Sequence, residues 1–319
     1  MRCTPTTSAS VSPLDKVTRP EPVETGIRAI DGLVTLGRGQ RVGVFAASGV
    51  GKTSLLVELV RNVEADRCVI ALVGERGREV EALWSRLSGA ERARTTLVAA
   101  TSDAAAALRV RAAHQALAIA EHWRGQGRHV LLVLDSVTRL AMALREIGLA
   151  AGEPPTVRAY TPSVFAALPA LVERCGAVRS GGAITTVMSV LAETDDVDDP
   201  ICELMKALLD GHIILSRDLA ERGHYPAIDA PRSISRLARH VRSAEHHADA
   251  TIALAHLARY EASRTLIEAG MYVAGSDADI DAALARRPGL LEFLQQAPDT
   301  RLALSESCAA LRRAVAPGS

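Results

Sequence analysis

Hydrophobic residues fall into short apolar runs that alternate with longer stretches of helical periodicity. Apolar runs bounded by polar residues predict buried strands at 42–45, 68–73, 95–100, 130–134, 182–192 and 212–215. Patterns typical of helices lie between these runs, beginning near residue 52 and at 104–123, 165–174 and 201–209. Residues 148–164, which contain three prolines, are expected to form a loop. The alternation predicts an α/β fold with a mostly parallel sheet.

The pattern changes near residue 242. From there on, helical periodicity continues without strand-like runs, at 243–269, 277–285, 288–296 and 302–315. The boundary between the second and third of these helices is placed at Pro288, because proline interrupts a helix. We therefore expect an α/β core at 20–241 and a small C-terminal all-helical domain at 242–319. Residues 1–19 are rich in Ser, Thr and Pro and are expected to form a disordered tail.

Composition narrows the class of protein. The chain has 319 residues, 48% of them hydrophobic, which is enough for a sizeable core. Its formal net charge is zero, which argues against a nucleic-acid binder. Its five cysteines are scattered without a Cys-x-x-Cys motif, and no apolar run is long enough to span a bilayer. We therefore expect a soluble, cytoplasmic protein.

The segment 42–56, VGVFAASGVGKTSLL, has the pattern of a phosphate-binding loop. A β-branched apolar strand leads into small residues, whose backbone N–H groups could wrap a phosphate chain at the start of a helix. The residues concerned are Ala46, Ala47, Ser48, Gly49, Val50, Gly51, Lys52, Thr53 and Ser54. Lys52 would reach the β- and γ-phosphates and the Thr53 hydroxyl would bind Mg²⁺. The strict pattern has Gly at the position of Ala46, and an ordinary strand–turn–helix remains the alternative.

Two further strand tips carry acidic residues. Glu75 and Arg76 follow the run 68–73, and ligands of open α/β sheets bind at the carboxyl ends of strands. The alternative is that Glu75 is only an acid at a helix N-terminus. Asp135 follows the run 130–134, an arrangement typical of the Walker B carboxylate that holds the Mg²⁺ shell. Arg139, four residues on, either joins this site or caps a surface; the sequence leaves both open.

Seven motifs, in order, resemble the export ATPases of type III secretion, relatives of the catalytic subunits of rotary ATP synthases. The motifs are GIRAIDGLVTLGRGQRVGVFAASGVGKTSLL, ALVGERGREVE, ATSD, LVLDSVTRLAMALREIGLAAGEPP, PSVFAALPALVER, LLDGHIILSRDLAERGHYPAID and SISR. The resemblance runs from about residue 20 to 315. It implies a RecA-like P-loop NTPase core and a C-terminal helical domain, with ATP and Mg²⁺ as cofactors.

The resemblance also implies roles for individual residues. Glu75 matches the acid that polarises the attacking water, and Arg76 a γ-phosphate contact. Asp135 matches the Walker B acid and a ligand of Mg²⁺. Tyr225 matches a tyrosine that lies against the adenine. Arg236, in SISR, matches the arginine finger that a neighbouring subunit supplies.

By resemblance, the chain hydrolyses ATP to energise protein export and unloads chaperone-bound cargo. Ala47 stands where flagellar members usually have Gly, which favours the injectisome branch. The implied partners are further copies in a homo-hexamer, stator and stalk proteins, and chaperone–cargo complexes, at the cytoplasmic face of the inner membrane. Family members carry an N-terminal β-barrel that forms the hexamer's collar. Residues 1–19 leave no room for it, so the resemblance leaves open whether this chain forms a stable hexamer.

Two other functions fit parts of the sequence. Because TTVMSVL and ICELMKALLDG differ from the usual family segments, the chain could be a catalytically weak nucleotide-binding interaction module; intact Lys52, Glu75, Asp135 and Arg236 argue against this. An RNA-driven helicase of the transcription-terminator type shares the same core. That class needs a single-strand-binding barrel with stacking aromatics, and aromatic residues make up only 3% of this chain.

Overall fold

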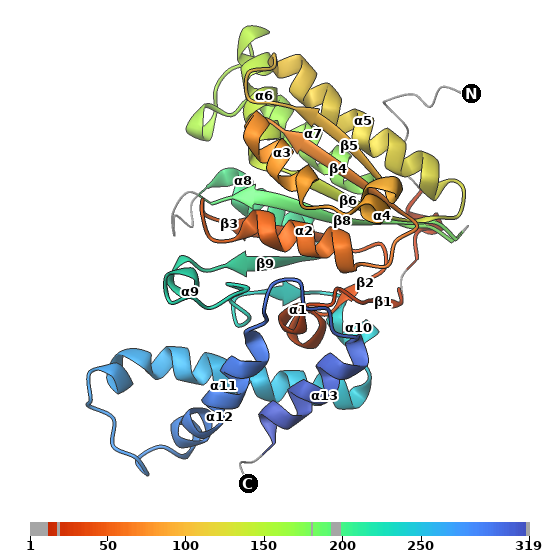
Figure 1. The fold of residues 1–319 in the computed structure, drawn as a ribbon. Helices are drawn as coiled ribbons and strands as arrows, with labels where there is room; N and C mark the ends of the chain where they lie inside the picture. Colours follow the sequence, from red (N-terminus) through yellow and green to blue (C-terminus); the bar gives the residue numbers. More distant parts are fainter. Residues whose placement is uncertain (1–11, 18–19, 180, 193–198, 317–319) are drawn as a thin grey trace.

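A parallel β-sheet forms the centre of the molecule (Figure 1). The computed structural model describes residues 12–17, 20–179, 181–192 and 199–316. Six parallel strands lie in the order β9-β3-β8-β6-β4-β5, with short antiparallel partners β10 on β9 and β7 on β8. Their bounds are β3 Arg41–Ala46, β4 Arg67–Val73, β5 Thr95–Ala100, β6 His129–Asp135, β7 Gly176–Ala177, β8 Ala183–Leu191, β9 Gly211–Leu215 and β10 Ile234–Ser235. All six predicted strands are confirmed.

The strands are hydrophobic on both faces because helices cover both faces of the sheet. Along β3, Val42 and Val44 enter the core on one face and Phe45 the core on the other, as the two-residue period of a strand requires. The first face is covered by α1 (Arg28–Leu33), α2 (Lys52–Asn62) and α3 (Gly77–Ser85). The second is covered by α5 (Ala106–Arg124), α6 (Val137–Ala150), α7 (Pro162–Glu173) and α8 (Pro200–Leu208).

Short elements complete the chain between these layers. The segment before the phosphate loop contains the two-stranded sheet of β1 (Pro22–Val23) and β2 (Leu36–Gly37). The short helices are α4 (Gly89–Arg94), α9 (Arg217–Glu221) and α10 (Ala238–Val241). The loop expected at 148–164 is shorter than predicted, because α6 continues to Ala150 and Pro162 opens α7 at a position where proline is favourable.

Three helices follow the core: α11 (Ala244–Glu268), α12 (Ala278–Leu294) and α13 (Leu304–Val315). The two helices expected on either side of Pro288 form the single helix α12. A proline inside a helix costs about 3 kcal/mol. Burial of Leu290, Phe293 and Leu294 beyond the proline stabilises the continued helix by a larger sum, roughly 1.5–3 kcal/mol for each side chain. No helix in the described ranges is both long and apolar enough to cross a membrane.

Part of the predicted disordered tail is structured. Residues 12–17 contain a short 3-10 turn (Pro13–Asp15) and run along β7, where Lys16 pairs with Val178 and forms an ion pair with Glu173. The remainder of the tail, residues 1–11 and 18–19, lies outside the described residues. A local low-hydrophobicity pattern does not reveal such an attachment, because the partners lie more than 150 residues away.

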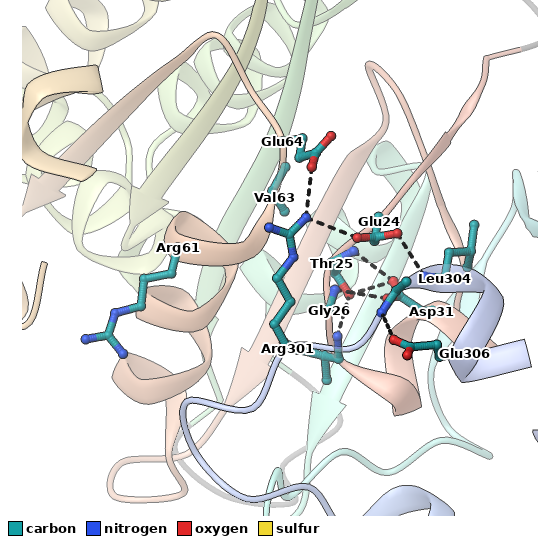
Figure 2. A network of polar contacts seen from close by, with 12 residues as sticks. Glu24, Thr25, Gly26, Asp31, Arg61, Val63, Glu64, Arg301, Leu304 and Glu306 are labelled. Atoms are coloured by element: carbon teal, nitrogen blue, oxygen red, sulfur yellow. Dashed lines mark hydrogen bonds and ion pairs between the residues drawn. The ribbon is translucent and has the colours of Figure 1, made fainter. Parts of the chain in front are cut away.

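The C-terminal helices share one apolar core with α1, α2 and the sheet, and they gather beside α1 in Figure 1. Polar contacts reinforce this attachment (Figure 2): Arg301 donates to Glu24 at 3.1 Å and to Glu64 at 3.0 Å. Within the segment that Arg301 contacts, the buried Asp31 of α1 accepts from the backbone N–H of Thr25 and of Gly26, both at 2.9 Å. Because the core is continuous, the domain boundary at 241/242 stays a prediction.

Candidate nucleotide site

The loop between β3 and α2 has the backbone of a phosphate cradle. Gly49 and Gly51 have φ of +83° and +94°, in the left-handed region where only glycine is unstrained. Gly51 is the N-cap of α2, so the free N–H groups of the first turn open into the loop. Val50, between the two glycines, is buried in the core and anchors the loop. The loop therefore offers backbone donors to an anion.

The position of Ala46 explains why alanine can replace the glycine of the strict loop pattern. Ala46 is the last residue of β3, pairs with Leu191 and Leu215 on either side, and is buried in extended backbone. An extended position does not need glycine's conformational freedom. The turn begins only at Ala47 and Ser48, so the alanine is compatible with a phosphate loop.

Lys52 is in contact with two buried carboxyl groups. Its Nζ donates to Asp135 Oδ1 and lies 3.8 Å from Glu75 Oε1. Glu75 follows β4 and Asp135 ends β6, and the residues are only 3% and 4% exposed. Ser189 of β8, the strand between β3 and β6, also donates to Asp135 Oδ1. Three of the predicted residues thus converge at the carboxyl edge of the sheet.

Arg139 belongs to this cluster, which decides between the two alternatives that the sequence left open. It lies in the first turn of α6, and its Nε donates to Glu75 Oε1 at 2.9 Å. Gly74 makes this approach possible: its φ is +73°, and an added Cβ would lie 3.0 Å from the Arg139 Cβ. The glycine of the GER motif therefore gives the arginine access to the glutamate.

The environment of Glu75 raises the pKa of its carboxyl to about 7. Burial is the main cause, followed by a hydrogen bond to Glu79 and the negative charge of Asp135. Lys52 and Arg139 act in the opposite direction. The shared hydrogen bond lowers the pKa of Glu79, so the pair holds its proton mainly on Glu75. A carboxyl that titrates near neutral pH is suited to positioning or polarising water.

Two predicted arginines lie outside the cluster. Arg76 is the N-cap of α3 and is exposed. Arg236 follows β10, whose Ser235 pairs with Gly211 at the start of β9. Since β9 runs parallel to β3, that is the end of the sheet opposite the phosphate loop. Arg236 is exposed there and donates to the Lys206 carbonyl at 3.2 Å.

Tyr225, which the resemblance places against the adenine, lies beside the phosphate loop. A Cβ added at Gly51 would lie 3.6 Å from the Tyr225 ring. A cavity of about 100 Å³ opens here between the start of α2 and residues 225–227, and Gln296 and Pro298 from beyond α12 form its remaining wall. Sequence analysis missed those two residues, as it missed Ser189 and Glu79. Contacts between distant segments leave no periodic signal in the chain.

The donor set of the site fits a magnesium ion bound together with phosphates. Among the residues the structure describes, no three His, Cys, Asp or Glu side chains gather as metal ligands. A P-loop cation needs only one hydroxyl and one carboxylate from the protein, since phosphates and water supply the other oxygens. Thr53 is in the first turn of α2 beside Lys52, and Lys52 reaches Asp135. The Thr53 hydroxyl and the Asp135 carboxylate offer the required oxygens.

A phosphate loop, a lysine and acidic residues at neighbouring strand tips define the class of P-loop nucleoside triphosphatases. Comparison with family models agrees: residues 26–235 match the nucleotide-binding domain of the ATP synthase alpha/beta family. Residues 242–313 match the C-terminal domain of the type III secretion ATPase EscN. The chain therefore belongs to the export ATPases of type III secretion and flagellar systems, and ATP is its nucleotide.

Individual relatives come from both branches of the family. The flagellum-specific ATP synthase of Pseudomonas aeruginosa is 48% identical over 98% of this chain and 70% of its own length. The type 3 secretion system ATPase of Pseudomonas syringae pv. tomato is 49% identical over 88% of this chain and 62% of its own. Sequence identity therefore does not separate the two branches.

Solved structures of EscN from enteropathogenic E. coli share the fold. The assembled ATPase is 42% identical, with a TM-score of 0.94 over 98% of this chain and 75% of that one. The same ATPase in complex with its central stalk EscO is 41% identical, with a TM-score of 0.90 over 98% of this chain and 75% of that one. The core and the C-terminal helices are therefore matched together.

The raised pKa of Glu75 predicts that the stability of the folded protein depends on pH. The unfolded chain releases the Glu75 proton near the ordinary pKa of 4.5, whereas the folded protein holds it to about pH 7. Between these values the wild type should lose stability as the pH rises, whereas Glu75→Gln should not. Between pH 5 and pH 8, the free energy of unfolding of Glu75→Gln should therefore rise by about 1–2 kcal/mol relative to that of the wild type.

Urea unfolding of nucleotide-free protein at several pH values measures this difference. Glu81→Gln, an exposed glutamate on the same helix α3, is the matched control and should follow the wild type. Parallel stability curves for Glu75→Gln and the wild type would contradict the raised pKa.

Proposed function

We propose that this ATPase hydrolyses magnesium–ATP to energise protein export through an injectisome, and that it unloads chaperone-bound cargo. The observation that carries the chemistry is the convergence of Lys52, Arg139, Glu75 and Asp135 at one edge of the sheet. Phosphoryl transfer to water needs positioning and charge neutralisation more than covalent catalysis. A site with two cations and two acids beside a phosphate cradle supplies both.

The loop residues 46–51 and the first turn of α2 would hold the triphosphate through backbone N–H groups. Lys52 would turn from Asp135 towards the β- and γ-phosphates, whose charge attracts its ammonium more strongly. Thr53 and Asp135 would hold Mg²⁺, which neutralises phosphate charge when bound. Ser189 keeps the Asp135 carboxylate oriented through its hydrogen bond.

Glu75 would orient the attacking water in line with the γ-phosphorus. Its ionised form is needed for this, and Arg139 stabilises that form by donating a hydrogen bond. Arg76, exposed at the next residue, would extend over the γ-phosphate. Tyr225 would form one wall for the adenine, beside Gly51.

Arg236 would act on the nucleotide of a neighbouring copy. Its exposed position at the opposite end of the sheet from its own phosphate loop supports an action in trans. The relative EscN has been solved as an assembled ATPase and with a central stalk. By analogy, a ring of six copies would surround a stalk protein here, and stator proteins would hold it at the cytoplasmic face of the inner membrane.

The first test concerns the catalytic acid. Glu75→Gln keeps the size and a hydrogen-bond acceptor for Arg139 but removes the carboxylate. Turnover, measured as steady-state phosphate release, should fall by at least about 10²-fold, while magnesium–ATP still binds by calorimetry. The exposed control Glu81→Gln should retain wild-type turnover. Wild-type turnover in Glu75→Gln would show that Glu75 has another role.

The second test concerns action between copies. An arginine supplied in trans makes turnover depend on assembly and contributes about 10³–10⁵ in rate. The specific activity of the wild type should therefore rise with protein concentration, and Arg236→Ala should abolish that rise without weakening ATP binding. The nearby exposed Arg239→Ala serves as control. An unchanged concentration dependence in Arg236→Ala would rule out a finger in trans.

The third test concerns the branch and the cargo, for which the support is Ala47 in the phosphate loop. In a strain lacking its injectisome ATPase, the chain should restore secretion of a chaperone-dependent effector. It should not restore swimming in a strain lacking the flagellar export ATPase; the reverse pattern would assign the flagellar branch. In vitro, ATP should release free chaperone from a chaperone–effector complex with the wild type and not with Glu75→Gln.

A further inference from the structure

Gln296 connects three distant segments beside the nucleotide site. It follows α12 and is buried, 9% exposed, although it is a polar residue in a loop. Its Oε1 accepts from the backbone N–H of Arg28 at 2.9 Å, and its Nε2 donates to the carbonyls of Gly26 and Thr300 at 2.7 and 2.6 Å. Its backbone N–H donates to the Tyr225 carbonyl at 2.9 Å. One residue thus joins Tyr225 to the entry of α1.

The Gly26 carbonyl, which accepts from Gln296, belongs to a tightly packed segment. Gly26 has a φ of +69°, and an added Cβ would lie 2.9 Å from both Arg301 and Asn62, so the chain is tightly enclosed there. Figure 2 shows the Arg301 guanidinium reaching Glu24 and Glu64, the latter just beyond the end of α2. The carbonyl that Gln296 binds is therefore fixed relative to the helix that opens with Lys52.

Other bonds hold the neighbours of Tyr225 in the chain: the His224 N–H donates to the Leu219 carbonyl at 2.9 Å, and the Ala227 carbonyl accepts from the Ser216 N–H at 2.8 Å. Tyr225 is 43% exposed, and its hydroxyl donates to the carbonyl of Ala220 in the preceding helix α9 at 3.3 Å. The hydrogen bond from the Gln296 N–H connects the Tyr225 backbone to the segment that leads into α1. Gln296 also lines the cavity that Tyr225 borders. Gln296 therefore helps to fix the position of the Tyr225 ring beside Gly51.

We propose that Gln296 is a positioning residue for the base subsite: it holds the Tyr225 wall at the phosphate loop and so sets the affinity for adenine. This inference rests on the proposed role of Tyr225. A side chain without amide donors would remove this donor from the Thr300 carbonyl. It would leave the buried Gly26 carbonyl with only the 3.5 Å bond from the Leu302 N–H, so the segment would move. The phosphate cradle, built on Gly49, Gly51 and α2, does not depend on these bonds.

The experiment compares a ligand that has a base with one that lacks it. Gln296→Leu removes the amide at nearly constant volume, and Gln295→Leu makes the same change at the preceding, exposed position. Dissociation constants are measured by calorimetry for magnesium–ATP and for magnesium with inorganic tripolyphosphate. Gln296→Leu should weaken ATP binding about tenfold and change tripolyphosphate binding less than about twofold. Gln295→Leu should change neither.

A double substitution tests whether Gln296 acts through Tyr225. Tyr225→Ala should weaken ATP binding, and adding Gln296→Leu should weaken it no further, because the wall is already absent. If Tyr225→Ala leaves ATP affinity unchanged, the proposed adenine contact fails. If Tyr225→Ala weakens ATP binding and Gln296→Leu does not, the inference about Gln296 is overturned. An equal loss for ATP and tripolyphosphate also overturns it.

A second variant covers the case in which Gln296→Leu does not fold. Gln296→Glu keeps the acceptor for the Arg28 N–H, but at pH 8 its carboxylate cannot donate to the Gly26 and Thr300 carbonyls. It should weaken ATP binding at least as much and leave tripolyphosphate binding unchanged. Lowering the pH to protonate the introduced carboxyl should restore part of the ATP affinity, which a general packing defect would not do.

Discussion

The balance of charge around two buried carboxyl groups is the constraint on which the site depends. Glu75 and Asp135 sit at strand tips, almost removed from water, and isolated charges there would be strongly destabilising. Lys52 and Arg139 offset them with two positive charges from the starts of α2 and α6. The raised pKa of Glu75 shows that the compensation is incomplete. A site held in this state is poised to receive a polyanion with its cation.

The order of strands makes this balance possible. β8 lies between β3 and β6, so Ser189 projects at the same edge as Lys52 and Asp135 and orients the carboxylate. β4 on the other side of β6 carries Glu75. Each of these residues comes from a different crossover, and only a parallel sheet brings their carboxyl ends together. The chemistry therefore depends on long-range pairing throughout the core.

The C-terminal helices are packed on the core beside the candidate nucleotide site. They share the apolar core of α1 and α2, and the segment after α12 reaches the cavity beside Tyr225. Because any coupling between sites is reciprocal, a nucleotide that binds more tightly when this segment is ordered must also stabilise the attachment of the helices. Such a connection gives a hydrolysis cycle a physical route to the C-terminal helices.

The sequence by itself determined the strands, the phosphate loop and the acidic strand tips, because these depend on local periodicity and on residues next to one another. It left the role of Arg139 open, divided α12 at Pro288 and did not reveal Ser189, Glu79 or Gln296. It also placed residues 12–17 in a disordered tail. The tertiary structure decided these points, because each depends on burial or on a partner that lies far away in the chain or on a neighbouring element. Such partners are brought together only when the sheet and its covering helices pack.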